Sequence, residues 1–293
     1  MIQRRRFKLK LRSGALELGG RTLVMGVLNV TPDSFSDGGK FIAPERAVEH
    51  ALEMERAGAD LLDIGGESTR PGSPGTSADE ELARVRPVLE KLRGRLKIPI
   101  SIDSRKADVA EAALLAGAEI INDVSGLKHD PRMAEVAVPH GAPLILMHMR
   151  GEPDTMQKGP FARDVMKDVV AGLRTSLALA RKAGVPKTQT ILDPGIGFGK
   201  SFEQNYEVLR RLPELAKLGC PLLVGTSRKG FLGATLARDG KAPPPEDRLS
   251  ATAATVTASI LGGAHIVRVH DVAEMVEVAR VADCVLACSK KPK

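Results

Sequence analysis

Aromatic residues are scarce in this chain. Its 293 residues include no tryptophan, one tyrosine and seven phenylalanines, which is 3% in all. Proteins that bind single-stranded nucleic acids stack bases on such side chains. The net charge is +7, but basic residues are spread along the chain, as in RVRPVLEKLRGRLK, which reads as one solvated helix face. The sequence therefore predicts no nucleic-acid partner, and the positive charge favours an anionic small-molecule substrate.

Cysteine is also rare. The three residues, Cys220, Cys284 and Cys288, form no C-x-x-C pair. A structural zinc site needs about four ligands, so no zinc or redox centre is predicted. Cys284 and Cys288 are four residues apart in a predicted helix, and we expect both to pack inward as small apolar residues. So few cysteines are typical of proteins in a reducing compartment.

Long apolar runs are absent as well. No segment reaches the roughly 18 apolar residues that a membrane-spanning helix needs. The amino terminus, MIQRRRFKLK, is basic but is not followed by the apolar stretch of a signal peptide. We therefore expect a cytoplasmic protein without a membrane anchor.

What the sequence does contain is a repeated alternation of a short apolar strand, a polar loop and an amphipathic helix. The strands are runs of Val, Ile and Leu, as expected for parallel strands that are covered on both faces. The predicted strands are residues 22–30, 61–66, 99–103, 119–125, 143–149, 190–195, 221–227 and 265–270. The predicted helices are 44–58, 78–95, 107–117, 132–141, 163–184, 204–219, a stretch through 262, and 272–287.

Eight strand–helix units of even spacing predict an α/β fold, a (β/α)8 TIM barrel, in one domain over residues 1–293. The alternative is a doubly wound open sheet, but the sequence has no nucleotide-binding fingerprint. Residues 5–20 predict a short N-terminal β-hairpin that plugs the barrel floor. The proline-rich stretch 237–248 predicts an exposed loop after the seventh strand.

Polar side chains stand at or just after the end of every predicted strand. In a barrel enzyme these ends meet at one mouth, where the active site lies. One such residue is often a helix cap or a loop contact, but the whole set indicates a functional site. Its members are Asn29, Glu67, Ser68, Thr69, Arg70, Asp103, Asn122, His148, Asp193, Ser227, Lys229, Arg268 and His270.

The residue types indicate two kinds of contact. Asp103, Asn122 and Asp193 could grip the N–H-rich edge of a flat heterocycle through charge-assisted hydrogen bonds. The side chains of Arg70, Arg268 and His270 suit phosphate oxygens. Lys229 would lie between them. These residue types therefore predict that the mouth has a surface that binds a heterocycle and a rim that binds an anion.

Two glycine-containing segments also bear on the site. DPGIGFGKS at 193–201 looks like a P-loop, but Pro194 stands where that motif requires its first glycine. We interpret it as a tight turn that lets backbone approach a ligand. TPDSFSDGG at 31–39 is either a plain solvent loop or a lid over the mouth.

Taken together, these segments resemble the dihydropteroate synthase family from about residue 17 to residue 280. The motifs that carry the resemblance are VMGVLNVTPDSFSDGG, LLDIGGESTRPGS, SIDS, INDVSG, LMHMRGEPDTMQ, DPGIGFGK, GTSRKGFLG and RVHDV, in this order. The resemblance implies a homodimeric TIM barrel. It also implies Mg2+-dependent joining of 6-hydroxymethyl-7,8-dihydropterin pyrophosphate to p-aminobenzoate, and sulfonamides as inhibitors.

The same resemblance implies roles for individual residues. Asp103, Asn122, Asp193 and Lys229 would bind the pterin, with Met147 packing on its ring, and Asn29 would ligate Mg2+. Thr69, Arg70, Arg268 and His270 would hold the pyrophosphate. Pro71, Phe198, Ser227 and the loop residues Ser34, Phe35 and Ser36 would enclose p-aminobenzoate. The loops 31–39 and 68–76 would order over the site as substrates bind.

The residue types agree with a path in which pyrophosphate leaves before the arylamine attacks. Catalytic roles would then fall to Asp103, Asp193, Lys229 and Arg268, and no Ser-His-Asp or Cys-His set is needed. Two alternatives share the predicted fold. One is a pterin-dependent methyltransferase, which resembles this chain less in the loops at 31–39 and 68–73. The other is an inactive relative that only binds pterin.

Overall fold

The computed structural model describes residues 4–31, 39–68, 75–152 and 155–288, with backbone only for 39–43. Eight parallel strands form one sheet in the order β8-β7-β6-β5-β4-β3-β10-β9. They are β3 (Leu23–Asn29), β4 (Leu61–Gly65), β5 (Ile100–Asp103), β6 (Ile120–Asp123), β7 (Leu144–Met147), β8 (Thr190–Asp193), β9 (Leu223–Val224) and β10 (Ile266–Val269).

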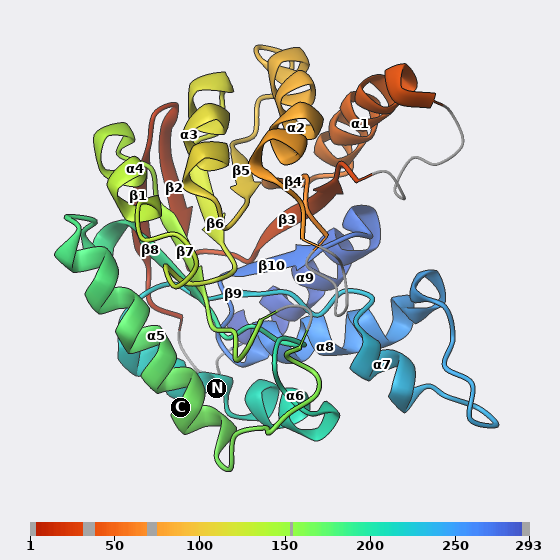
Figure 1. The fold of residues 1–293 in the computed structure, drawn as a ribbon. Helices are drawn as coiled ribbons and strands as arrows, with labels where there is room; N and C mark the ends of the chain where they lie inside the picture. The colour runs from red at the N-terminus through yellow and green to blue at the C-terminus, as the bar shows by residue number, and fades with distance from the viewer. Residues whose placement is uncertain (1–3, 32–38, 69–74, 153–154, 289–293) are drawn as a thin grey trace.

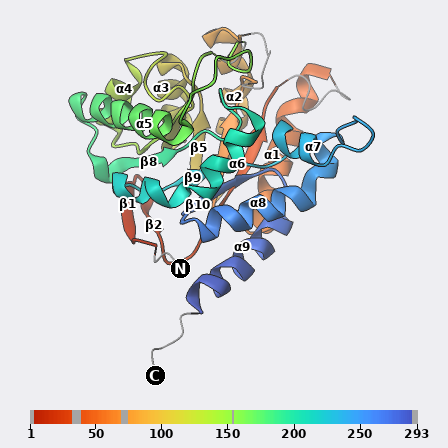
Figure 2. The ribbon, with the colours of Figure 1, turned by 90° about the horizontal axis from the view of Figure 1, so that it is seen from below.

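The sheet closes into a barrel. A parallel bridge joins Leu192 of β8 to Leu222, next to β9, and the amide of Leu192 donates to the Pro221 carbonyl over 2.9 Å. The helices lie around the outside of the strands (Figures 1 and 2). The predicted TIM barrel is therefore confirmed.

The helices follow the predicted ranges with some shifts at their ends. They are α1 (Gly39–Arg56), α2 (Ala78–Leu92), α3 (Ala107–Ala116), α4 (Met133–His140), α5 (Val165–Lys182), α6 (Phe202–Arg210), α7 (Gly230–Thr235), α8 (Leu249–Leu261) and α9 (Val272–Ala287). Helix α1 begins five residues before the predicted start at Pro44. Helix α2 begins as predicted, because the side chains of Ser77 and Glu80 form a capping box.

Two predicted helices are broken. The range 204–219 divides into α6 and a 3-10 helix, Leu212–Leu218, because Pro213 has no amide hydrogen to continue the α-helical ladder. The stretch through 262 divides into α7 and α8. Between them lies the exposed proline-rich loop and a short 3-10 helix, Pro245–Arg248. A further 3-10 helix, Lys187–Gln189, precedes β8.

Two apolar cores can be distinguished. The larger lies between the strands and the surrounding helices. The smaller lies inside the barrel and includes one or two buried residues from seven of the eight strands, namely Leu23, Met25, Leu61, Ile120, Ile145, Ile191, Leu223 and Ile266. Only β5 contributes a polar residue at this level, the buried Ser101. We call this set the floor layer.

A two-stranded hairpin completes the floor layer. Its strands are β1 (Phe7–Leu11) and β2 (Gly14–Leu18), antiparallel, with Leu9 paired to Leu16. Leu9, Leu16 and Leu18 are buried in the same cluster as the floor layer. The predicted N-terminal plug is therefore confirmed, and it shields the amino-terminal end of the barrel interior from water.

The structure corrects one prediction about the cysteines. Cys284 and Cys288, expected to pack inward, are exposed, whereas Cys220 is buried. Helix α9 packs against its neighbours through Val272, Met275, Ala279 and Ala282, whereas Cys284 lies on the outer face of the helix with the exposed Val281 and Val285. Among the described residues, no helix is both long and apolar enough to cross a membrane.

Candidate active site

The candidate site lies one step above the floor layer. Side chains that are two residues apart on a strand face the same side of the sheet. Adding two to the floor positions therefore gives the next interior residues along the strands. These are Asp63 in β4, Asp103 in β5, Asn122 in β6, Met147 in β7, Asp193 in β8 and Arg268 in β10. We call this set the site layer.

Four members of the site layer form one hydrogen-bonded network. Arg268 donates from Nε to Oδ2 of Asp63 and from Nη2 to Oδ2 of Asp103, each over 2.6 Å. The amide Nδ2 of Asn122 donates to the same Asp63 oxygen over 2.9 Å. Because Asp63 receives the nitrogen end of that amide, the oxygen end of Asn122 is left for another donor.

Two acceptors of the network are left unfilled by the described part of the chain. The second carboxylate oxygens of Asp63 and Asp103 are buried and have no hydrogen-bond partner among the described residues. A buried acceptor without a partner costs about 1–3 kcal/mol. Burial also raises the pKa of Asp103 to about 7, opposed by the charge of Arg268 and assisted by that of Asp63. Such a site is suited to a ligand that brings N–H groups.

Asp193 and Lys229 form the opposite side of the layer. Asp193 accepts the Gly195 amide over 2.7 Å, and burial raises the pKa of its carboxyl group. The ammonium group of Lys229 donates to the Ile196 carbonyl and lies 4.7 Å from the centre of the Phe198 ring. Burial lowers the pKa of Lys229 to about 8, against the effect of Asp193.

An apolar wall adjoins these charges. Met147 is buried in a small cluster with Val124, Met149 and Met156, and the half-buried Phe198 packs against it. The predicted proximity of Met147 and Phe198 is thus present. A flat ring could lie against this wall while its edge meets the carboxylates.

The loops after β9 and β10 are joined by contacts between two successive residues of each loop. Ser227 Oγ accepts the His270 amide over 3.2 Å and lies 2.9 Å from His270 Nδ1. The next residues, Arg228 and Asp271, form an ion pair with 3.1 Å between Nε and Oδ2. Asn29 and His270 line one cavity of about 440 Å3, whose other walls come mainly from α1 and the start of α9 rather than from the site layer.

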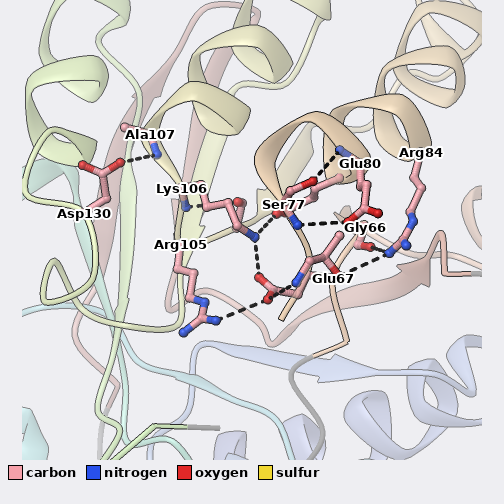
Figure 3. Close-up of polar contacts among 12 residues, drawn as sticks. Gly66, Glu67, Ser77, Glu80, Arg84, Arg105, Lys106, Ala107 and Asp130 are labelled. Atoms are coloured by element: carbon pink, nitrogen blue, oxygen red, sulfur yellow. Dashed lines mark hydrogen bonds and ion pairs between the residues drawn. The ribbon is translucent and has the colours of Figure 1, made fainter. Parts of the chain in front are cut away.

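A second group of buried charges lies where the loop after β4 begins and ends (Figure 3). Glu67 accepts Lys106 Nζ over 2.7 Å and Arg105 Nη2 over 3.3 Å. Lys106 also reaches Glu81, over 2.5 Å. Glu67 additionally accepts the amide of Thr76, so the group links both ends of the loop.

These contacts decide the charge states of the two carboxylates. Burial acts to raise the pKa of Glu67, but the hydrogen bonds and charges of Lys106 and Arg105 lower it below its ordinary value. Glu81 is fully buried, and its burial raises the pKa. Glu67 was predicted to face the mouth, and the structure shows instead that its carboxylate is already engaged by protein groups.

One strand-end prediction is wrong. His148 does not join the site layer, because it follows the inward-facing Met147 and so faces the opposite side of the strand. Its Nε2 lies 3.3 Å from Asp168 on α5. Gly172 on the same helix leaves room for the ring, since a Cβ there would lie 2.5 Å from His148 Cδ2.

Asp63 was missed. It stands in the middle of LLDIGG rather than at a strand end, and an acidic residue inside an apolar strand was the available signal. The predicted residues Thr69, Arg70, Pro71, Ser34, Phe35 and Ser36 lie outside the described residues. The structure otherwise brings Asp103, Asn122, Met147, Asp193, Phe198, Lys229 and Arg268 to one end of the barrel, beside Asn29, Ser227 and His270.

Comparisons with known proteins agree with this geometry. The model of the family described as pterin binding enzyme matches residues 25–270. The dihydropteroate synthase of Synechocystis is 51% identical over 265 residues, covering 90% of each chain. The Xanthomonas albilineans dihydropteroate synthase structure with 4-aminobenzoic acid has a TM-score of 0.89 at 41% identity, covering 97% of this chain and 100% of that one.

A Yersinia pestis dihydropteroate synthase structure with a sulfonamide drug gives the same TM-score, 0.89, at 42% identity and the same coverage, 97% and 100%. The likeness extends over the barrel, the hairpin and the site layer rather than over one motif. On these grounds, the chain belongs to the pterin-binding enzyme family and, within it, to the dihydropteroate synthases.

Proposed function

We propose that this chain condenses 6-hydroxymethyl-7,8-dihydropterin pyrophosphate with p-aminobenzoate, giving 7,8-dihydropteroate and pyrophosphate in folate biosynthesis. The observation that carries the proposal is the site layer. It sets buried acceptors with unfilled hydrogen-bonding capacity beside an apolar wall and two cations, in a chain 51% identical to a dihydropteroate synthase. A dihydropterin presents both a flat ring and an N–H-rich edge.

Binding of the pterin is assigned to Asp103, Asn122, Asp193 and Lys229. The free oxygens of Asp103 and Asn122 would accept the ring N–H groups, and Lys229 would donate to a ring carbonyl or nitrogen. Met147 would pack on the ring face. Charge-assisted bonds of this kind are about twice as strong as neutral ones, so they hold the ring in one orientation.

Departure of pyrophosphate is assigned to the cationic side of the layer. Arg268 uses two of its five N–H groups on Asp63 and Asp103, which leaves others for phosphate oxygens. Together with His270, Thr69 and Arg70, it would stabilise the charge that grows on the leaving group. Asp103 and Asp193 would favour the positive charge that develops on the ring.

Asn29 fits a role in holding Mg2+. In the described ranges, no three His, Cys, Asp or Glu side chains are grouped to hold a metal, so these ranges contain no complete set of ligands of those types. Mg2+ is often held by a few protein oxygens together with substrate phosphates. Asn29 lines the same cavity as His270, and its side-chain oxygen could be one such ligand. When bound, the ion would neutralise charge on the pyrophosphate.

The second substrate would meet Phe198, Ser227 and Pro71, with the loop residues Ser34, Phe35 and Ser36. An arylamine is nucleophilic as the neutral base, so orientation against the ring carbon supplies much of the catalysis. Sulfonamides, one of which is bound in the Yersinia pestis structure, would compete for this place.

The deciding experiment measures pyrophosphate release from the dihydropterin pyrophosphate in Mg2+, with and without p-aminobenzoate. We expect fast release that depends on p-aminobenzoate and is blocked by a sulfonamide. Slow release with the pterin ester alone would support departure of pyrophosphate before attack. Tight pterin binding in calorimetry without any release would refute the proposal and favour the methyltransferase or the inactive relative.

A homodimer and a cytoplasmic location are part of the same proposal. Exposed Phe202 and Tyr206 on α6 and Leu236 after α7 lie on one side of the barrel, where Tyr206 and Pro213 also line a shallow cleft with α8. This apolar area could be covered by a second copy, and light scattering at micromolar concentration would give the mass. The three unpaired cysteines fit a reducing compartment, and fractionation of cells would locate the protein.

A further inference from the structure

Lys200 is among the largest fully buried side chains in the described part of the chain, although it belongs to the glycine-rich segment 193–201 that looks like a phosphate-binding loop. Its ammonium group donates to the carbonyls of Gly195 and Phe198 over 2.8 and 3.0 Å. It also contacts His148, at 3.1 Å from the ring Nδ1 and at 3.5 Å from the carbonyl oxygen. An ammonium group has three N–H donors, so all three are used within the protein.

His148 completes this arrangement as a neutral ring. Its Nδ1 must accept from Lys200, which places the ring proton on Nε2, and that nitrogen faces Asp168 at 3.3 Å. Burial and the charge of Lys200 lower the pKa of His148, which keeps the ring neutral. The amino group of Lys200, whose pKa is lowered to about 7 by burial against the effect of Asp193, is thereby linked through the ring to a carboxylate on α5.

The segment that Lys200 spans has little rigidity of its own. Gly195, Gly197 and Gly199 all have positive φ angles, of 65°, 86° and 62°. A Cβ at Gly195 would lie 1.9 Å from the His148 carbonyl oxygen, so no other residue fits there. Glycine loses more conformational freedom on folding than other residues, so such a turn needs external contacts to hold one conformation.

The turn carries two groups that face Lys229. The Ile196 carbonyl accepts a hydrogen bond from Lys229 Nζ, and the Phe198 ring lies beneath the same ammonium group. Lys200 donates to the carbonyl of Gly195, which precedes Ile196, and to the carbonyl of Phe198 itself. A shift of the turn would therefore move the aromatic wall relative to Lys229.

We propose that Lys200 is a positioning residue that fixes the turn 195–198, so that Phe198 keeps its place as a wall of the second-substrate site. This inference rests on the proposed function, which puts p-aminobenzoate against Phe198. Two of the four pterin-binding residues, Asp103 and Asn122, are held away from the turn by their network with Asp63 and Arg268. The other two, Asp193 and Lys229, each make one hydrogen bond to the turn, so the pterin should feel its loss less than p-aminobenzoate does. Loss of Lys200 should therefore affect the two substrates unequally.

The test replaces Lys200 by methionine, which keeps the apolar stem and removes the ammonium group. We expect the KM for p-aminobenzoate to rise about 10-fold or more, because small misplacements of a positioned substrate are costly. The KM for the pterin ester should change less than about threefold, on the same argument. Lys182→Met, at an exposed lysine of α5, is the matched control and should match the wild type.

A double-mutant cycle with Phe198→Ala tests the route of the effect. If Lys200 acts through Phe198, Lys200→Met should add little to the KM for p-aminobenzoate once Phe198 is alanine. Full additivity, or an equal rise in both KM values, would overturn the inference. An inactive wild-type protein would instead refute the proposed function, so the two failures can be told apart.

If Lys200→Met does not fold, His148→Leu takes its place. That change removes the ring nitrogen from the acceptors of Lys200 and leaves the backbone carbonyls of residues 148, 195 and 198. A rise of about threefold in the KM for p-aminobenzoate alone supports the inference, on the scale of a weakened positioning contact. Unchanged or equally changed KM values in that variant would contradict it.

Discussion

The floor layer and the site layer stand two residues apart on the same strands, yet they differ in almost every property. In β8, Ile191 belongs to the apolar floor and Asp193 to the site; in β10 the same step leads from Ile266 to Arg268. A rise of two residues is about 7 Å in a strand. The barrel interior thus changes from a closed apolar core to a charged site over two residues of each strand.

The difference follows from what covers each end. The hairpin seals the amino-terminal end with leucines, so the floor gains from burying apolar surface. At the other end the carboxylates stay partly uncompensated, as shown by the unfilled oxygens of Asp63 and Asp103. The floor layer therefore contributes mainly to stability, and the site layer contributes mainly to ligand binding.

The largest effect is expected from Arg268→Ala. It removes the cation between Asp63 and Asp103 and leaves two buried carboxylates facing each other, which should cost about 3–5 kcal/mol in the free energy of unfolding. It also removes the donor assigned to the leaving group, so kcat/KM should fall about 1000-fold. Urea unfolding and steady-state kinetics would measure the two losses.

The anion role can be separated from the structural one by calorimetry. Arg268→Ala should weaken binding of the pyrophosphate ester far more than binding of free hydroxymethyl dihydropterin. Equal losses for both ligands would contradict that role. Arg132→Ala, which breaks an exposed ion pair with Asp108, should leave kinetics unchanged.

Leu18→Ala should lower stability and leave catalysis nearly unchanged. Leu18 is 2% exposed and packs in the floor layer. Its truncation leaves a cavity and should lower the free energy of unfolding by about 2–5 kcal/mol. The kcat/KM of the folded enzyme should stay within about twofold, because the site layer keeps its own network.

An exposed leucine provides the comparison for that variant. Leu115 on α3 is 66% exposed, so Leu115→Ala should change stability by less than about 0.5 kcal/mol. A loss of kcat/KM in Leu18→Ala at full folding would show that floor and site are not independent.

Much of the fold and some of the site could be predicted from sequence. The strands are continuous apolar runs with polar ends, so their positions, the barrel and the mouth residues Asp103, Asn122 and Asp193 could be predicted. Asp63 was missed because the prediction considered strand ends, while the barrel interior also continues along each strand in steps of two. His148 was wrong for the same reason, since neighbours on a strand face opposite sides.

The pairing of charges could not be predicted. Arg268 and Asp63 are 205 residues apart, and only barrel closure brings them together. The sequence likewise indicated a tight turn at 193–201 but not that Lys200 would be buried inside it. Glu67 had been predicted at the mouth from its place after β4, whereas its partners, Lys106 and Arg105, come from the loop after β5.

The smallest expected effect is a shift in a pH profile, and it tests whether the site layer acts as one electrostatic unit. The pKa of Asp103 is about 7, chiefly because of burial, with Arg268 lowering it and Asp63, Glu81 and Glu67 raising it. If the ionised form of Asp103 is required, kcat/KM should fall as the pH drops through about 7. The pH dependence of kcat/KM reports the free enzyme, to which this pKa applies.

Asp63→Asn should move that acid limb to lower pH by about one unit, because a neutral amide removes a charge that raises the Asp103 pKa. The shape of the side chain is kept, and its oxygen can still accept from Arg268. Asp108→Asn, at an exposed carboxylate of α3, should leave the profile in place. A limb that stays at pH 7 in Asp63→Asn would mean that Asp103 does not control the profile or that Asp63 does not act on it. A shift toward higher pH would show that Asp63 acts mainly by holding Arg268 close to Asp103. In Asp63→Asn the guanidinium would then move away, and the Asp103 pKa would rise more from that loss than it falls from the loss of the Asp63 charge.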